Sequence, residues 1–379
     1  MKKQKKIKKI LIHIGPDKTG SSSIQSALHN HRKLLLENKI YYAPGKFNVT
    51  IGSIFSSYPE KFIFNILKRP NKTRQEIIQE DREYFFKTKK HFFNINSEVM
   101  IISSENLAYL DKKGIKRFYK YLKKLSDNLE IIAYLRDPLS YAKSAISQRV
   151  KTGFISWDDE NVPILPYEDI LKKYVKIFGK DKINLRMFSD VNLNKSGVVD
   201  DFLSLVNLKR VFKEKILKNT SVQNPSLSQE AIQIGDRIVT TIGKNLGKGS
   251  IFYEKIGIKL SKIKGNKINL NDSQNWLILK HSLPNIYYLA KEFGIILSPG
   301  KIEQIVPSKL SNSQINLIAR KLLLEEFPNF SMKIKDIPTK KKIDQNLTKN
   351  NFIKLLSKNN TSLIMSFFLK IRLLFINRI

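Results

Sequence analysis

The stretch IHIGPDKTGSSSIQ, residues 12–25, joins an apolar run to a serine-rich segment through a glycine-bounded loop. Residues 10–14 are apolar and β-branched apart from His13, and Gly15-Pro16 follows them, which predicts a buried strand that ends in a loop. From Ser21 onward, apolar residues recur at helical spacing, and we expect residues 21–23 to supply the helix N-cap. The stretch therefore predicts a central parallel strand, a loop and a helix.

Strand and helix patterns alternate on both sides of this unit. Further strands are predicted at residues 40–43, 99–102, 131–135 and 183–188, and helices at 112–124, from Asp137-Pro138 onward and at 197–206. Such alternation favours a mostly parallel sheet with helices on both faces, and ligands bind such sheets at the carboxyl ends of the strands. We therefore predict an α/β protein with a three-layer α/β/α core.

The predicted core extends over residues 1–206 and contains a basic, aromatic-rich insertion at about 44–98, which we assign to the acceptor side. Residues 207–332 lose the strand signals and show helical patterns at 229–239, 276–293 and 313–327, which predicts a helical addition or cover. A linker rich in lysine and asparagine and an apolar, basic tail form residues 333–379.

The tail segment 361–379 is too short and too charged to span a bilayer. Because it is both basic and apolar, it suits peripheral contact with an anionic membrane, or alternatively a C-terminal helix packed on the body. The charged start of the chain runs into a short apolar stretch and then Gly15-Pro16, unlike a secretion signal. We therefore expect a cytoplasmic protein, with membrane contact limited to the inner face.

The formal charge of +35 points to an anionic partner, although lysine is spread along the whole chain. A solvated basic surface and a functional basic groove both account for that pattern. The absence of cysteine excludes disulfides, thiolate nucleophiles and cysteine-ligated zinc. Histidine and acidic residues form no cluster with metal-ligand spacing, so no metal is expected.

The loop between the first strand and the first helix is a natural anion cradle, because backbone N–H groups and a helix N-terminus converge there. Gly15 and Gly20 keep the glycine spacing of a nucleotide-triphosphate P-loop, G-x-x-x-x-G-K-[ST]. However, Ser21 occupies the lysine position and the lysine is Lys18. That order argues against ATP, and it would let Lys18 reach the bridging oxygen of a transferring group while Ser21 and Ser22 donate to a phosphate.

These residues resemble the 5′-phosphosulfate-binding loop of the sulfotransferase family, where K-T-G-[ST]-[ST] follows the first strand. The resemblance implies a P-loop-like fold and 3′-phosphoadenosine-5′-phosphosulfate (PAPS) as the sulfuryl donor, with no metal. The implied donor-binding residues of the loop are Lys18, Thr19, Gly20, Ser21 and Ser22.

A second segment, IIAYLRDPLSYAKSAIS, is similar to the 3′-phosphate-binding segment of the same family. In that segment Arg-[DN]-Pro follows a strand, and a serine stands eight positions after the arginine. Arg136 and Ser144 have that spacing here, which implies that they bind the donor's 3′-phosphate. Taken singly, Arg136 fits an ordinary salt bridge and Ser144 an exposed helix serine. The resemblance covers roughly residues 10–206, without a match to the family's C-terminal donor-binding loop.

In-line sulfuryl transfer needs a cation at the leaving oxygen and a base for the acceptor. Lys18 suits the first role. Glu105, in the segment VMIISSENLAYL, ends an apolar strand at the same edge of the sheet and is our candidate base. An N-cap or a salt bridge to a loop lysine is the alternative for Glu105. Among the histidines, His13 fits a core position and His91 lies in the insertion.

The sequence thus predicts a sulfotransferase of the carbohydrate-modifying kind, which acts on a hydroxyl or amine of a carbohydrate or glycolipid. The enzyme alternative is a P-loop kinase, which the position of Lys18 disfavours. A nucleic-acid-binding protein is the alternative from another class, but no helix-turn-helix, RRM or zinc-finger pattern occurs, so we expect no specific nucleic acid.

Overall fold

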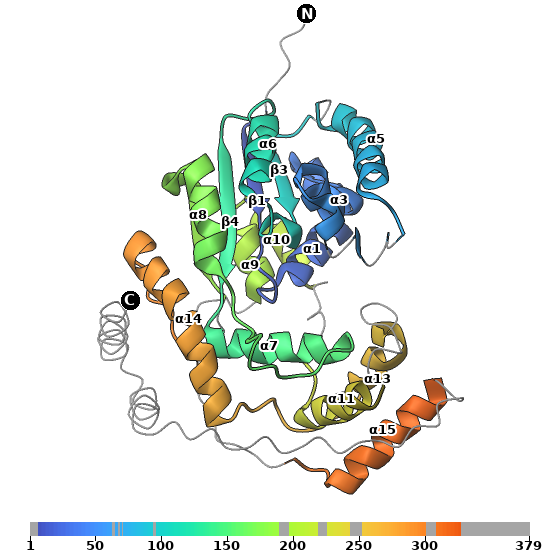
Figure 1. Ribbon diagram of the computed structural model, residues 1–379. Helices are drawn as coiled ribbons and strands as arrows, with labels where there is room; N and C mark the ends of the chain where they lie inside the picture. Colours follow the sequence, from blue (N-terminus) through green and yellow to red (C-terminus); the bar gives the residue numbers. More distant parts are fainter. Residues whose placement is uncertain are drawn as a thin grey trace, which may run out of the picture. The chain divides into compact units, whose positions relative to one another are not determined.

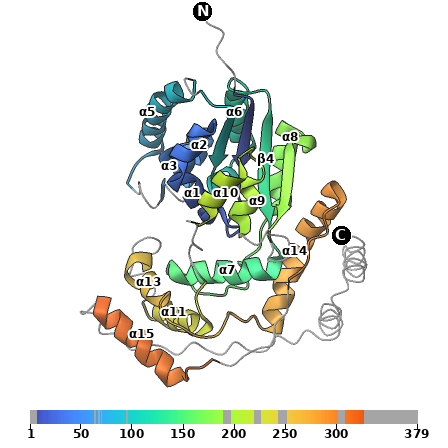
Figure 2. The same ribbon diagram turned by 180° about the vertical axis from the view of Figure 1, so that it is seen from behind.

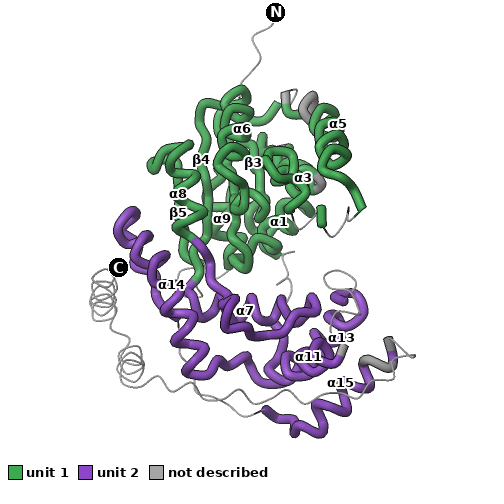
Figure 3. The backbone as a smooth tube through the Cα atoms, viewed as in Figure 1, with its two compact units in different colours: residues 1–136, 167–223 green, residues 137–166, 224–379 purple. Residues whose placement is uncertain are grey.

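The computed structural model describes residues 7–62, 65–66, 69, 71–93, 96–188, 197–218, 226–242, 252–300 and 308–326. The chain divides into two compact units (Figure 3). Unit 1 comprises residues 1–136 and 167–223, and unit 2 comprises residues 137–166 and 224–379. The predicted tail at 361–379 and its linker lie outside the described residues. The domain boundaries drawn from the sequence at 206 and 332 stay predictions.

Unit 1 contains a five-stranded, all-parallel sheet with the order β2-β3-β1-β4-β5, which confirms the predicted α/β class (Figure 1). The strands are β1 (Lys9–His13), β2 (Ile40–Tyr42), β3 (Val99–Ser103), β4 (Leu129–Leu135) and β5 (Ile183–Met187). The strand β1 is central, as its almost unbroken apolar run predicts, since a central parallel strand is buried on both faces.

Helices cover both faces of this sheet (Figures 1 and 2). One face carries α1 (Ser21–Asn30), α9 (Gly197–Leu203) and α10 (Arg210–Lys218), and the other carries α6 (Lys112–Leu122) and α8 (Tyr167–Phe178). Strand residues Leu11 and Ile132 pack with Ile24 of α1 and Phe202 of α9 in one buried cluster. This buried cluster packs α1, the helix that follows the predicted ligand loop, against the sheet.

Shorter elements connect these layers. They are α2 (Arg32–Glu37), η2 (Glu105–Leu107) and η3 (Lys180–Lys182). The insertion predicted at 44–98 folds as α3 (Gly45–Phe55), η1 (Pro59–Lys61) and α5 (Arg74–Phe93). Its aromatic side chains mostly serve packing: Phe47 and Phe55 of α3 contact Phe85 of α5, whose ring lies 4.9 Å from that of Tyr121. Phe86 is among the exceptions and is exposed.

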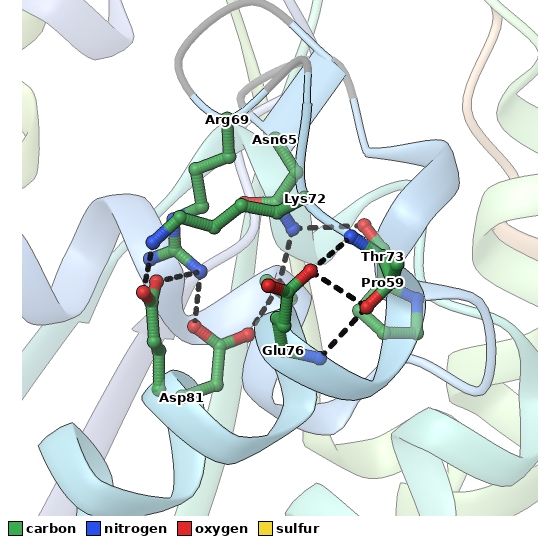
Figure 4. A network of polar contacts seen from close by, with 9 residues as sticks. Pro59, Asn65, Arg69, Lys72, Thr73, Glu76 and Asp81 are labelled. Carbon is green, nitrogen blue, oxygen red and sulfur yellow. Dashed lines mark hydrogen bonds and ion pairs between the residues drawn. The ribbon is translucent and has the colours of Figure 1, made fainter.

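A polar network ties the parts of this insertion together (Figure 4). The buried carboxylate of Asp81 accepts a hydrogen bond of 2.9 Å from Arg69 Nη1 and contacts Ser53. The N–H and hydroxyl of Thr73 each donate to Glu76 at 2.7 Å, and the Glu76 N–H returns a bond to the Thr73 hydroxyl, which forms a capping box at the start of α5. Nearly every charge in this network has an opposite charge beside it.

Unit 2 is helical. It contains α7 (Pro138–Lys151), α11 (Gln229–Ile242), η4 (Tyr253–Gly257), α13 (Ile258–Leu260), α14 (Asp272–Phe293) and α15 (Asn312–Glu326). The predicted helices of the second half of the chain are thus confirmed. Apolar residues of α7, α11 and α14, such as Ile146, Ile234 and Ile278, form one buried cluster. No helix in the described part of the chain is long and apolar enough to cross a membrane.

Two expected caps had opposite outcomes. Asp137 caps α7, because its side chain accepts a 2.9 Å hydrogen bond from the Ser140 N–H, and Pro138 is the first helical residue, as predicted. The expected serine cap of α1 is wrong. Gly20 is the N-cap, with a left-handed φ of 86°, and Ser21 is already helical. Tight closure of the loop requires the left-handed turn, which glycine adopts without steric cost.

Candidate functional site

The candidate site lies where β1, β3 and β4 end. The loop that follows β1 is held at this edge by a 3.0 Å hydrogen bond from the Ile14 N–H to the Ile132 carbonyl. On the other side of β1, the Ser104 N–H donates to the His13 carbonyl at 3.0 Å, which places η2 and its first residue Glu105 beside the loop. Parallel strands thus bring together segments about ninety residues apart in sequence.

The loop from Gly15 to Gly20 has a tightly constrained backbone. Lys18 has a φ of 62°, which is unusual for a residue other than glycine, and Thr19 Oγ1 donates a 2.6 Å hydrogen bond to the Pro16 carbonyl. A Cβ atom on Gly15 would lie 2.4 Å from Ser21 Oγ, and one on Gly20 would lie 2.8 Å from the Phe188 ring. Both glycines are therefore needed for the observed loop.

The loop leads directly into the N-terminus of α1, and no side chain in the described part of the chain caps this helix. The Ser21 hydroxyl is buried and has no hydrogen-bond partner among the described residues, whereas Ser22 is exposed. His13 is fully buried beside Ser21, with its Nδ1 2.8 Å from Ser103 Oγ, and burial lowers the pKa of His13 to about 3. An uncapped helix N-terminus with an unsatisfied hydroxyl suits an anion.

Arg136 holds the loop from the end of β4. Its Nη1 donates a 2.6 Å hydrogen bond to the Lys18 carbonyl, and its guanidinium lies 5.1 Å from the centre of the Phe188 ring. The Arg136 N–H donates to Tyr167 Oη at 2.7 Å, so the first residue of α8 fixes the arginine backbone. Arg136 thereby supports the left-handed turn at Lys18, a contact that its sequence pattern does not predict.

Lys18 stands largely withdrawn from water. Burial lowers the pKa of its ammonium group; the nearby carboxylates of Glu105 and Asp17 offset part of this effect, and the Arg136 charge adds to it. A lysine in this setting is less hydrated than a surface lysine. Its ammonium group can therefore interact strongly with charge that develops on a bound group.

Glu105 faces Lys18 and Asp17 across the loop. Burial raises the pKa of Glu105 to about 7; the negative charge of Asp17 contributes to the rise and Lys18 opposes it. The Asp17 carboxylate in turn accepts a 2.8 Å hydrogen bond from Tyr109 Oη. Ser104, rather than Glu105, occupies the N-cap position of η2, so the cap alternative for Glu105 does not apply.

Most of the predicted site residues meet at this edge of unit 1, which carries the loop residues 15–22, Glu105 and Arg136. Ser144 lies in α7 and belongs to unit 2, so its predicted pairing with Arg136 stays a prediction. Sequence reasoning missed Asp17, Tyr109 and Tyr167. The described residues contain no group of three or more histidine and acidic side chains that could hold a metal ion.

Comparisons with known proteins are sparse. No family model matches the chain, and no curated protein matches its sequence. Among solved structures, a sulfotransferase from Alicyclobacillus acidocaldarius is 14% identical with a TM-score of 0.39, and covers 74% of this chain and 94% of its own. A chain of the PezAT toxin-antitoxin system of Streptococcus pneumoniae is 12% identical with a TM-score of 0.28, and covers 57% and 86%. Scores of this size establish no family for the chain.

Proposed function

We propose that the protein is a sulfotransferase that moves a sulfuryl group from PAPS to a hydroxyl or amine of a carbohydrate or glycolipid. The observation that carries the proposal is the position of Lys18 and Glu105, which face each other beside the uncapped N-terminus of α1. A cation for the leaving oxygen and a base for the acceptor are the two groups that the reaction needs.

Donor binding is assigned to the loop and the start of α1. The unsatisfied, buried hydroxyl of Ser21 and the uncapped helix N-terminus fit the phosphate and sulfate oxygens of such a donor. Arg136 and Ser144 are proposed for the 3′-phosphate, as the resemblance implies. Arg136 donates one N–H to the Lys18 carbonyl, which places its guanidinium beside the loop.

In the proposed reaction, the acceptor oxygen or nitrogen forms a bond to sulfur as the bond from sulfur to the bridging phosphate oxygen breaks. Lys18 stabilises the negative charge that develops on the bridging oxygen. Glu105 accepts the proton that the acceptor loses. A carboxylate with a pKa of about 7 is a far stronger base than an ordinary glutamate, and much of it is still ionised near neutral pH.

The acceptor assignment rests on the insertion that carries α3 and α5. The Asn106 side chain donates a 2.7 Å hydrogen bond to the Val49 carbonyl, so α3 adjoins η2 and the proposed base. Tyr109, which follows η2, is nearly half exposed at this edge and offers a ring against which a sugar could pack. These features support an acceptor that approaches from the side of α3.

The kinase alternative predicts a different donor, so a binding experiment separates the two functions. The wild-type protein is heated with PAPS or its product 3′-phosphoadenosine-5′-phosphate, or with ATP and Mg²⁺, and the melting temperature is measured. We expect the first two ligands to raise it without Mg²⁺ and ATP to have little effect. A rise with ATP and Mg²⁺ alone would refute the sulfotransferase proposal and favour the kinase.

The contribution of Arg136 is tested in the same assay. Arg136→Lys keeps the charge but loses the fork of N–H groups that contacts the loop, and it should weaken the shift given by 3′-phosphoadenosine-5′-phosphate. Arg186→Lys is a matched control, because Arg186 lies on the neighbouring strand β5 and forms an ion pair with Asp201 of α9, away from the loop. The control should leave the ligand-induced shift unchanged.

A further inference from the structure

Two buried polar atoms border the same small space beside Gly15. They are Nε2 of His13 and Oγ of Ser21, and a Cβ atom placed on Gly15 would lie 2.9 Å from the first and 2.4 Å from the second. Neither atom has a hydrogen-bond partner among the described residues. A buried polar group without a partner costs free energy, so two of them at the start of the proposed ligand loop call for an explanation.

The His13 ring is held in one orientation. His13 and Ser103 are partners in the register of β1 and β3, and His13 Nδ1 lies 2.8 Å from Ser103 Oγ. The ring also packs against Tyr134 and Phe202, with 5.8 Å and 5.6 Å between ring centres. Because a flip of the ring would break the contact with Ser103, Nε2 stays on the side of Ser21.

The imidazole of His13 is neutral at physiological pH, since the side chain is fully buried and burial lowers its pKa to about 3. A neutral imidazole carries one proton, so one ring nitrogen donates and the other accepts. When the Ser103 hydroxyl donates to Nδ1, the proton is on Nε2, on the side of Ser21. The hydrogen bond with Ser103 therefore decides what His13 offers to Ser21.

The Ser21 hydroxyl has one proton to donate and two lone pairs that accept. If it accepts from His13 Nε2–H, its own proton is left for an anion at the N-terminus of α1. The opposite histidine tautomer would take up that proton and leave only lone pairs facing the anion, which is unfavourable. The Glu105 carboxyl group also lies near the Ser21 hydroxyl, but no hydrogen bond joins them.

We propose that Ser103, His13 and Ser21 form a hydrogen-bond relay in which His13 is a positioning residue. Its Nε2–H donates to Ser21 Oγ and so directs the Ser21 hydroxyl proton to a bound phosphate or sulfate oxygen. The inference rests on the proposed function for the identity of that anion as part of PAPS. A serine side chain turns between staggered rotamers, so the bond from His13 forms as the anion binds. Both buried atoms then have a partner.

The tautomer and its response are tested by NMR on the protein labelled with ¹⁵N in its histidine rings. The His13 signals are assigned by their loss in His13→Gln. At neutral pH we expect a protonated Nε2 and an unprotonated Nδ1 in the free protein. Inorganic sulfate, and separately 3′-phosphoadenosine-5′-phosphate, should shift the Nε2–H resonance in the wild type but not in Ser21→Ala at saturating ligand. A proton on Nδ1, or an Nε2–H resonance that neither ligand moves, would overturn the relay.

The affinity for 3′-phosphoadenosine-5′-phosphate tests the relay through Ser103. Ser103→Ala removes the donor to Nδ1 and should weaken binding by about tenfold, the effect of about one hydrogen bond. Ser126→Ala is the matched control, because Ser126 is an equally buried serine of unit 1 that precedes β4, at the opposite end of the strands, and contacts the Asn128 backbone. The control should bind as the wild type does. Unchanged affinity in Ser103→Ala would also overturn the relay.

Substitution of His13 separates positioning from packing. His13→Gln keeps an N–H donor at about the reach of Nε2 and should lose less than about threefold in affinity, whereas His13→Met fills similar space without a donor and should lose about tenfold. Equal losses in the two variants would mean that His13 only packs. A His13 signal that responds to sulfate but not to the nucleotide would leave the relay intact and refute PAPS as the donor, so the two failures are distinct.

Discussion

The loop site and the network of the insertion both combine acids with cations, yet they arrange them in opposite ways. In the network, Asp81 is buried but has Arg69 at 2.9 Å, and Lys72 pairs with Glu80. In the site, two acids lie side by side and Lys18 has lost much of its water. The network pairs acids with cations of opposite charge. The site instead keeps a base whose pKa lies near neutral pH and a weakly hydrated cation. Paired charges stabilise a fold, whereas groups with strongly shifted pKa values are typical of catalytic sites.

We expect the largest loss of sulfuryl transfer when Lys18 is substituted. Lys18→Ala should reduce sulfuryl transfer by about 10³-fold, since it removes the cation that opposes charge on the leaving oxygen. Lys39→Ala is a matched control because Lys39 has the same φ of 62° but is exposed and remote from the loop. Both variants change a left-handed lysine, so a fall in rate limited to Lys18→Ala separates chemistry from backbone strain. Equal rates for the two variants would contradict the role of Lys18.

Removal of a charged side chain from the network should lower the stability of the protein and leave ligand binding intact. Asp81→Ala removes the partner of Arg69 within a largely buried ion pair, and should lower the free energy of unfolding by about 3 kcal/mol. The shift in melting temperature caused by 3′-phosphoadenosine-5′-phosphate should stay the same. Denaturant unfolding of the variant measures the first effect. Loss of ligand binding in the folded variant would show that the network belongs to the site.

Glu105→Gln should abolish transfer and yet stabilise the protein above neutral pH. The pKa of Glu105 rises from 4.5 to about 7 in the folded state, so the folded protein binds a proton that the unfolded chain releases between these values. Its stability therefore falls as the pH rises from about 4.5 to 7. At pH 8 the variant should gain about 2 kcal/mol over the wild type, with allowance for partial solvent screening. No gain at pH 8 would mean that Glu105 ionises freely.

The smallest effect is expected for a row of lysines on α6, which lies outside both the loop site and the network. Lys112, Lys116 and Lys120 are exposed and lie four residues apart along α6. Like charges at this spacing are mildly unfavourable, so Lys116→Gln should stabilise the protein by about 0.5 kcal/mol at low salt and by less at 0.5 M salt. Chemical denaturation at the two salt concentrations measures the difference. A loss of stability on this substitution would show that Lys116 has a favourable partner.

Local patterns were sufficient to predict much of the fold. The five predicted strands are the five strands of the sheet, and Asp137-Pro138 begins a helix as predicted. The loop position between β1 and α1 also follows from local sequence. These features depend on side-chain periodicity and on neighbours in the chain, which a sequence displays directly.

Features set by distant contacts were not predictable. The hydrogen bond from Tyr109 to Asp17 joins residues 92 positions apart. The support that Tyr167 gives to Arg136 depends on how α8 packs beside β4. The serine cap failed for a related reason: the close approach of Phe188 and Val198 leaves space only for glycine at position 20. In each case the deciding neighbour comes from a distant part of the chain.

The most direct test of the account is transfer of ³⁵S from labelled PAPS to a panel of carbohydrates and glycolipids, with wild type, Lys18→Ala, Glu105→Gln and Lys39→Ala assayed in parallel. We expect labelled product with the wild type and Lys39→Ala, at a rate that rises with pH through about 7 as Glu105 ionises. The two site variants should give almost none. Labelling at the wild-type rate by Lys18→Ala and Glu105→Gln would rule out the proposed roles of these two residues.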